Sequence, residues 1–273
     1  MSAHQDRHLR DAEVAAKSPR ELRSMFRLSQ WRAPTAGLAP GYVQANVVIL
    51  PKDQAFDFLV FCQRNPKPCP LLEVLEPGRV EPRIISPRAD IRTDLPRYRI
   101  YRHGVLTGEA EEILKEWRDD LVTFLLGCSF TFESALKSAG IPLRHIAEGK
   151  NVSMYITNRP TVRSGVFAGP MVVSMRPVPR DMVVRAVQVT SRFPSAHGAP
   201  VHIGDPLAIG IRDLSRPDYG DPVTIEEGEV PVFWACGVTP QAVAIESKPS
   251  LMITHSPGHM FITDLRDEDL AVI

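Results

Sequence analysis

Runs of apolar residues and apolar–polar alternation divide the chain into short strands and helices. Strand patterns, in which apolar residues cluster or alternate, predict strands at 44–50, 71–75, 98–101, 121–126, 151–157, 171–176, 230–235 and 250–254. Apolar residues at helical spacing predict helices at 9–29, interrupted by Pro19, and at 179–192. A helix after Pro51 is expected to bury an apolar side formed by Phe56, Leu59, Val60 and Phe61. Residues 109–118 are expected to form a charged surface helix.

Two strand–turn–helix units stand out in this pattern. In the first, the apolar strand 121–126 leads through Gly127-Cys128-Ser129 into a helix at 131–139. In the second, strand 230–235 leads through Cys236-Gly237-Val238 into a helix with Thr239 as its N-cap and Pro240 at its first position. Repeated units of this kind predict an α/β fold, a layered mixed sheet flanked by helices, with ligands bound beyond the carboxyl ends of the strands.

The region between the two units differs in its predicted secondary structure, because loops dominate it from residue 195 to 228. We therefore expect a larger α/β domain formed by residues 1–150 plus 225–273. A smaller α+β domain, residues 151–224, is inserted in it. A length of 273 residues is sufficient for either one large domain or two smaller ones.

Charge and cysteine content narrow the class of protein. Basic and acidic residues balance at 32 each, which argues against nucleic acid as the main partner. No apolar run approaches the ~18 residues of a membrane span, and the polar N-terminus does not resemble a secretory signal. The four cysteines match no zinc signature, so reduced thiols in a cytoplasmic protein are expected. The oligomeric state stays open, a homo-oligomer included.

The thiols of the two turns are the first catalytic candidates. Cys128 and Cys236 each precede a predicted helix, whose N-terminal potential lowers the pKa of a nearby thiol. Two such thiols facing one cleft suit proton transfer at an α-carbon or attack on an acyl carbon. Simple packing of buried cysteines is the alternative, because unbonded cysteine is among the most buried residue types.

Arginine and loop residues supply further candidates. Arg176 ends a predicted strand, and its planar fork suits a substrate carboxylate; Arg144 is a second candidate clamp, or else part of a surface ion pair. The loop at 197–206 contains His197, His202 and Asp205, which we interpret as acid, base or orienting groups. A divalent metal on these three side chains, or a turn that satisfies its own backbone, are the alternatives. No phosphate-binding glycine loop is present, so no nucleotide cofactor is predicted.

Several longer strings carry a resemblance to a known family. They are Gly127-Cys128-Ser129-Phe130-Thr131-Phe132-Glu133, Arg144-His145, Asn151-Val152-Ser153-Met154-Tyr155, Val173-Ser174-Met175-Arg176-Pro177, Arg192-Phe193-Pro194, His197 to Pro206, Pro217-Asp218-Tyr219-Gly220-Asp221 and Glu229 to Gln241. In these strings the chain resembles the YcsI-like family, named "putative hydro-lyase", which in turn resembles part of the mitochondrial D-glutamate cyclase of animals. The resemblance implies a two-domain build and a reaction that removes water, such as conversion of D-glutamate to 5-oxo-D-proline.

The function predicted from these observations is a carbon–oxygen lyase that eliminates water from a small amino or hydroxy acid, without a cofactor. The expected catalytic residues are Cys128, Glu133, His197, His202, Asp205 and Cys236. The expected substrate-binding residues are Ser129, Arg144, Asn151, Tyr155, Ser174, Arg176 and Thr239. Two rivals are a metal-assisted amide or lactam hydrolase that uses the 197–205 loop, and a non-catalytic binder of a small acid.

Overall fold

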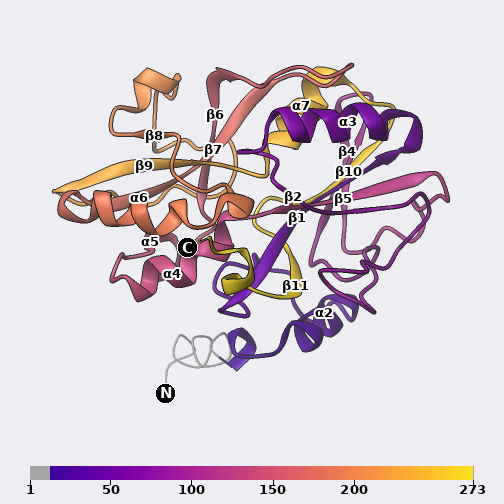
Figure 1. Ribbon diagram of the computed structural model, residues 1–273, viewed down its shortest axis with the longest axis horizontal. Helices are drawn as coiled ribbons and strands as arrows, with labels where there is room; N and C mark the ends of the chain where they lie inside the picture. Colours follow the sequence, from indigo (N-terminus) through magenta and orange to yellow (C-terminus); the bar gives the residue numbers. More distant parts are fainter. Residues whose placement is uncertain (1–12, 273) are drawn as a thin grey trace.

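A computed structural model describes residues 13–272 and contains two antiparallel sheets flanked by helices (Figure 1). The larger sheet has the order β2-β5-β1-β10-β3-β4, and β11 pairs with β1 beside β10. Its strands are β1 (Tyr42–Pro51), β2 (Leu71–Leu75), β3 (Tyr98–Arg102), β4 (Val105–Ala110), β5 (Leu121–Gly127), β10 (Met252–His255) and β11 (Phe261–Arg266). The predicted α/β class with layered sheets is therefore confirmed.

The smaller sheet has the order β6-β7-β9-β8. Its strands are β6 (Ser153–Pro160), β7 (Pro170–Pro179), β8 (His202–Ile203) and β9 (Glu229–Ala235). Strand β9, which we expected in the larger domain, pairs with β7 along its whole length. The division into 1–150 plus 225–273 and 151–224 stays a proposal, and the sheet pairing favours an inserted unit that ends after β9.

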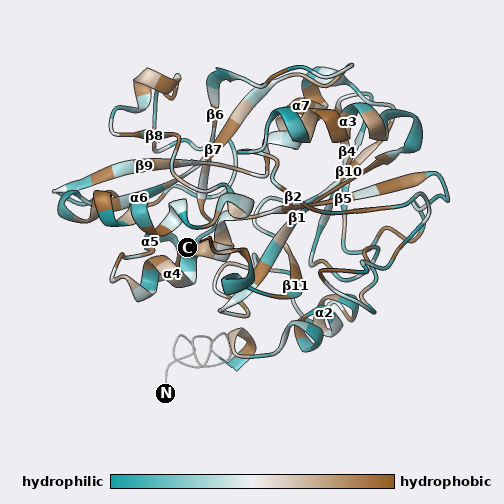
Figure 2. Cartoon of the chain, in the orientation of Figure 1, coloured by the Kyte–Doolittle hydropathy of each residue, from teal (hydrophilic) through white to brown (hydrophobic). Residues whose placement is uncertain are grey.

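Helices cover the sheets on sides set by their apolar residues. The described helices are α2 (Pro19–Arg27), α3 (Lys52–Arg64), α4 (Glu133–Ser138), α5 (Arg144–Ala147), α6 (Val183–Ser191) and α7 (Thr239–Ser247). Helices α3 and α7 share one apolar cluster with β1, β5 and β10, whereas α4 and α6 cover the face of the smaller sheet that carries Trp234. Helices α3 and α6 alternate between hydrophilic and hydrophobic residues along their length (Figure 2), as amphipathic helices do.

Short 3₁₀ segments connect these elements. They are η1 (Ser129–Phe132), η2 (Arg180–Met182), η3 (Pro194–Ala196), η4 (Pro206–Ile209) and η5 (Asp267–Leu270). Segment η1 begins one residue after Cys128 and ends where α4 begins, so the helical part of the first predicted strand–turn–helix unit is a 3₁₀ turn followed by the short α4.

Two expectations about the elements need correction. Residues 109–118 do not form a helix, because Glu109 belongs to β4 and pairs with Arg99 of β3; tertiary pairing here outweighs the helix propensity of the glutamate-rich run. The strands of both predicted units pair in antiparallel fashion, in two different sheets. The expected helix from residue 9 begins outside the described residues, and Pro19, which we expected to interrupt it, is the first residue of α2.

Candidate functional site

The two cysteine-bearing turns meet between the sheets. Cys128 and Cys236 belong to one apolar cluster, together with Met154 and Val172. Asn46 of β1 links the turns: its Nδ2 donates to the carbonyl of Gly127, and its side chain fills the space that a Cβ at position 237 would need. A close approach of this kind requires glycine at that position. The tertiary structure therefore brings the two predicted thiols into one region.

Burial makes these thiols poor nucleophiles. It raises the pKa of Cys236 to about 11 and raises the pKa of Cys128 further, although backbone N–H groups at the turns favour the thiolate. This is the reverse of the lowered pKa that we expected from the helix N-termini, because desolvation of the charged form outweighs the N–H donors. Both groups are protonated thiols at neutral pH.

Arg176 lies in a buried network of its own. The residue is 1% exposed, and its Nε lies 3.0 Å from Oε1 of Glu133. Its other nitrogens donate to Ser174 Oγ at 3.1 Å and to Ser129 Oγ at 3.0 Å, so four predicted site residues form one cluster. His145 Nε2 lies 3.1 Å from the same Glu133 oxygen, outside hydrogen-bond alignment. The guanidinium that we expected to bind substrate binds the protein's own carboxylate.

The electrostatics of this network favour a permanent ion pair. Burial raises the pKa of Glu133, but His145 and Arg176 outweigh that effect and hold the pKa below its ordinary value. The guanidinium also lies against aromatic rings, 5.4 Å from the centroid of Phe132 and 5.6 Å from that of Trp234. A substrate carboxylate would have to displace Glu133 to reach Arg176, and we therefore assign this arginine to structure.

The loop with two histidines is divided between the interior and the edge of the smaller sheet. His197 is 1% exposed, its Nδ1 lies 2.6 Å from the carbonyl of Lys67, and burial lowers its pKa to about 4. His202 Nε2 lies 2.6 Å from the backbone oxygen of Asp205, whose carboxylate accepts from the N–H of Leu207.

The two histidines therefore do not face a common site. The ring of His202 lies beside Phe233, and Phe233 packs in the cluster that contains Met175, opposite the face that carries Arg176. Because His197 lies in the interior while His202 and Asp205 form a turn at the edge, these three side chains do not form the metal site that we considered as an alternative. Across residues 13–272, no three His, Cys, Asp or Glu side chains lie together in a metal-binding arrangement.

Three other predicted substrate-binding residues have structural partners. Arg144 forms an ion pair with Glu229 at 2.6 Å. Tyr155 donates to the carbonyl of Leu214 at 2.7 Å. Thr239 is the first residue of α7, whose N-cap is Val238, and the Thr239 hydroxyl donates to the carbonyl of Cys236 at 2.7 Å.

A polar cleft opens where the two sheets meet, and we call it the junction cleft. It has a volume of about 410 Å³. Its lining residues are Arg97, Arg99, Glu109, Asn151, Asp218, Tyr219, Gly220, Ser256, Pro257 and His259. Arg97 directly precedes β3, Arg99 belongs to β3 and Glu109 to β4. The loop that pairs with β6 contributes residues 218–220, and the turn between β10 and β11 contributes the last three. Of the residues we expected to bind substrate, this cleft contains Asn151.

Two arginines give the cleft its positive wall. Arg99 Nε lies 2.8 Å from Glu109 Oε1, and Arg97 Nη1 lies 3.6 Å from Glu109 Oε2. Burial raises the pKa of Glu109, but the hydrogen bond and charge of Arg99 outweigh it and lower the pKa overall. Arg99 also reaches the buried Gln241, whose Oε1 accepts from Tyr101 at 3.1 Å. The cleft lining holds two arginines and two carboxylates, Glu109 and Asp218, so its formal charge balances, and the Arg97–Arg99 wall is the part suited to an organic anion.

A phenol and an imidazole complete the cleft. Burial raises the pKa of Tyr219 to about 12, so its hydroxyl is a neutral donor, and Arg99 lies 5.9 Å from its ring centroid. Burial lowers the pKa of His259, whose Nδ1 lies 3.0 Å from the carbonyl of Pro257 and whose Nε2 lies 3.2 Å from the carbonyl of Arg32, so the neutral ring donates to one of the two carbonyls. The side chain of Asn151 donates to the Pro257 carbonyl, and its Oδ1 is buried without a hydrogen-bond partner among residues 13–272. The cleft thus combines anion binding with one neutral acid and one neutral base.

Sequence comparison assigns the chain to a family. The sequence model described as D-glutamate cyclase matches residues 122–264. The chain belongs to the D-glutamate cyclase family. A protein of Geobacillus kaustophilus named "Putative hydro-lyase" is 66% identical over 95% of this chain and 99% of its own. "Putative hydro-lyase YcsI" of Bacillus subtilis is 62% identical over 94% of this chain and 100% of its own. The predicted resemblance is confirmed.

One solved structure is similar at a lower level. A nitrogen repressor-like protein of Methanococcus jannaschii aligns with 93% of this chain and 97% of its own, with a TM-score of 0.41 and 12% identity. That likeness is too distant to indicate a common function. In the described part of this D-glutamate cyclase family member, no helix has the length and apolar character needed to cross a bilayer.

Sequence reasoning missed most of the junction cleft in this family member. Arg99 and Tyr101 alternate along a short strand pattern, which places them on one side of β3, and Arg97 continues the same alternation just before the strand. Positive residues on one side of a strand were the available signal for an anion site. His259 follows a predicted strand within Ser256-Pro257-Gly258-His259, a shaped turn of the kind that often holds functional side chains. Tyr219 lies more than 100 residues from Arg99 in the chain, so only the fold shows that the two side chains meet.

Proposed function

We propose that this protein is a carbon–oxygen lyase that closes D-glutamate to 5-oxo-D-proline with loss of water in the junction cleft. Membership of the D-glutamate cyclase family supports the reaction class. The single observation that carries the choice of site is the cleft that joins Arg97, Arg99, Tyr219 and His259 from separate elements. Its volume of about 410 Å³ is in the range of small-molecule sites.

Each group of the cleft has a role in the proposed reaction. Glutamate carries two carboxylates, and two arginines on one wall can hold both. Arg99, the less exposed of the two, binds the side-chain carboxyl that loses oxygen, while Arg97 binds the other. Holding amine and carboxyl together removes the entropic part of the barrier to ring closure.

Proton transfers balance the proposed reaction. Neutral His259 takes a proton from the substrate ammonium, and the freed amine attacks the side-chain carboxyl carbon to form the ring C–N bond. Arg99 stabilises the tetrahedral oxyanion while the ring nitrogen passes its second proton to the other carboxyl oxygen. Tyr219 then donates a proton to the resulting hydroxyl, which leaves as water when the C–O bond breaks. The nitrogen loses two protons in total, and both leave with the oxygen as water. Proton transfer from His259 then restores Tyr219.

Product formation is the direct test of this function. Pure protein incubated with D-glutamate is expected to form 5-oxoproline, followed by chromatography, at a rate above the Arg99→Met variant. An Arg212→Gln variant, altered at an exposed arginine outside the cleft, serves as the matched control and should retain full activity. D-glutamate binding by calorimetry without product would leave the chain a binder of small acids and overturn the lyase assignment.

The pH dependence of the rate provides a separate prediction. Since burial lowers the pKa of His259 from its ordinary value of 6.5, the neutral base is present at neutral pH, and the rate should fall only below that value. Tyr219, with its pKa near 12, should produce no loss of rate between pH 7 and 10. Initial rates from pH 4 to 10 measure both limits. A rate that rises steeply from pH 7 to 9 would instead indicate a group with an ordinary or raised pKa as base.

A further inference from the structure

A second hollow lies where α2 packs against residues 87–94 and Asp264 of β11. It has a volume of about 320 Å³. Its lining residues are Arg20, Arg23, Ser24, Arg27, Pro87, Arg88, Asp94 and Asp264. The three arginines of α2 stand three and four positions apart, so they lie on one face of that helix. We call this site the arginine hollow.

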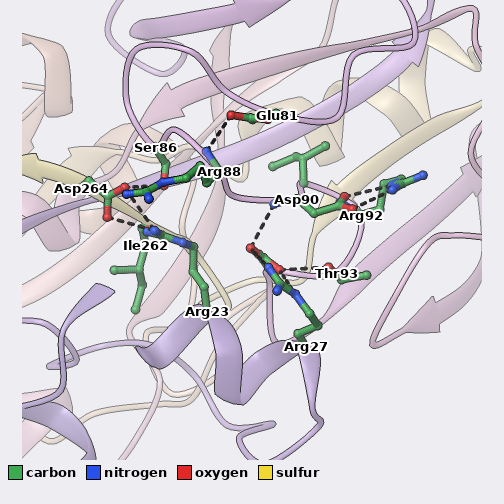
Figure 3. Close-up of polar contacts among 12 residues, drawn as sticks. Arg23, Arg27, Glu81, Ser86, Arg88, Asp90, Arg92, Thr93, Ile262 and Asp264 are labelled. Atoms are coloured by element: carbon green, nitrogen blue, oxygen red, sulfur yellow. Dashed lines mark hydrogen bonds and ion pairs between the residues drawn. The ribbon is translucent and has the colours of Figure 1, made fainter. Parts of the chain in front are cut away.

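Two of the four arginines are held by the protein's own carboxylates (Figure 3). Arg23 is 4% exposed, and its Nη2 donates to both oxygens of Asp264, at 3.0 and 3.1 Å. Ser86 donates to Asp264 as well, at 3.0 Å. Arg27 makes a two-point contact with the fully buried Asp94, through Nε at 2.9 Å and Nη2 at 2.7 Å. These pairs fix α2 to the protein and form the neutral floor of the hollow.

The remaining two arginines leave the hollow with an excess of positive charge. Among residues 13–272, neither the Arg20 nor the Arg88 guanidinium has an ion-pair or hydrogen-bond partner, although both line the hollow. The backbone of Arg88 is left-handed, with φ of 68°, and its N–H donates to the Glu81 carboxylate at 2.8 Å. The chain thus holds Arg88 at the rim in a conformation that non-glycine residues seldom adopt.

We propose that the arginine hollow binds a phosphate group. Arg20 comes from α2 and Arg88 from the segment between β2 and β3, and both line the hollow, so an anion bound there can contact two guanidiniums from separate elements. A tetrahedral dianion offers oxygens in both directions, whereas a planar monocarboxylate presents two oxygens to one fork. Four arginines and two aspartates line the hollow, which leaves two positive charges without a partner. The two negative charges of a phosphate dianion would balance them. This site is separate from the proposed reaction, and none of its lining residues belongs to the junction cleft.

Calorimetric titration at constant ionic strength tests the site. Inorganic phosphate and glycerol phosphate are the probes, because the phosphate can be free or part of a larger molecule. We expect saturable binding with one site per chain. An Arg20→Gln/Arg88→Gln double variant should weaken it by at least about tenfold, the loss typical of removing charge-assisted hydrogen bonds. Tighter binding of glycerol phosphate than of inorganic phosphate would identify an organic phosphate as the ligand class.

A matched variant and a conservative variant make the result decisive. Arg180→Gln/Arg212→Gln removes the same charge from exposed positions outside the hollow and should leave phosphate affinity unchanged. Arg20→Lys/Arg88→Lys keeps the charge without the planar fork and should give an intermediate affinity. Arg20 and Arg88 are exposed, so circular dichroism of the variants at these positions should show an unchanged fold. Equal phosphate affinity in the Arg20→Gln/Arg88→Gln variant and the wild type, or no saturable binding in the wild type, would overturn the proposal.

Discussion

Replacement of Arg99 by methionine is expected to lower the rate of 5-oxoproline formation by about 10²–10³-fold, the loss typical of removing one group that stabilises an oxyanion. Methionine keeps much of the apolar stem of arginine but cannot bind a carboxylate or face the developing negative charge. Arg99 is also held by Glu109 and Gln241, so its donors are oriented before substrate arrives. The measurement is kcat and KM for D-glutamate from initial rates.

A neighbouring arginine provides the control for this experiment. Arg102 lies on the same strand but outside the junction cleft, where it pairs with Glu116. The Arg102→Met variant should keep the wild-type rate. An Arg99→Lys variant, which keeps a positive charge without the planar fork, should recover only part of it. If the Arg99→Met and Arg102→Met variants have equal activity, the junction cleft is not the reaction site.

Breaking the buried Glu133–Arg176 pair should cause the largest loss of stability. The Arg176→Met change leaves the Glu133 carboxylate buried without its main partner, and loss of one member of a buried pair costs about 3–5 kcal/mol. Urea unfolding gives the free energy of unfolding for the wild type, the Arg176→Met and Glu133→Gln variants and the double variant. The double variant should be more stable than Arg176→Met, because no uncompensated charge remains in it.

Activity distinguishes this structural role from the substrate-binding role that the sequence predicted for Arg176. A Glu133→Gln variant that is folded at the assay temperature should keep a KM for D-glutamate close to that of the wild type, because neither residue lines the junction cleft. A folded variant with wild-type stability but a rate at least a hundredfold lower would return Glu133 and Arg176 to the catalytic machinery.

Local pattern predicted many strands but misplaced some faces. In α3, Phe58 and Phe61 are buried while Phe56 is 73% exposed, although the apolar residues of that helix are spread around it. Periodicity alone does not decide which apolar residue faces the sheet when a helix has apolar residues on several sides. Similarly, the run at 109–118 has helix-forming residues, and only the pairing of β4 with β3 makes Glu109 a strand residue.

For the candidate site, the sequence supplied groups but not their partners. The string that includes Arg176 indicated an important arginine, yet its 1% exposure and its contact with Glu133 follow from packing of η1 and α4 on the smaller sheet. His202 and His197 are five residues apart in the chain but belong to opposite environments. A two-residue strand takes His202 to the sheet edge, whereas the left-handed backbone at His197 turns its ring inward.

The family, the main strands, the break at Pro19 and the two cysteine turns could be read from the amino-acid sequence, because they depend on neighbouring residues or on long matching strings. Burial of the thiols, the contact of Arg176 with Glu133, and the meeting of Arg99, Tyr219 and His259 in one cleft came from the folded chain. Burial and charge environment depend on residues far apart in the chain, and these come together only when the two sheets pack against each other.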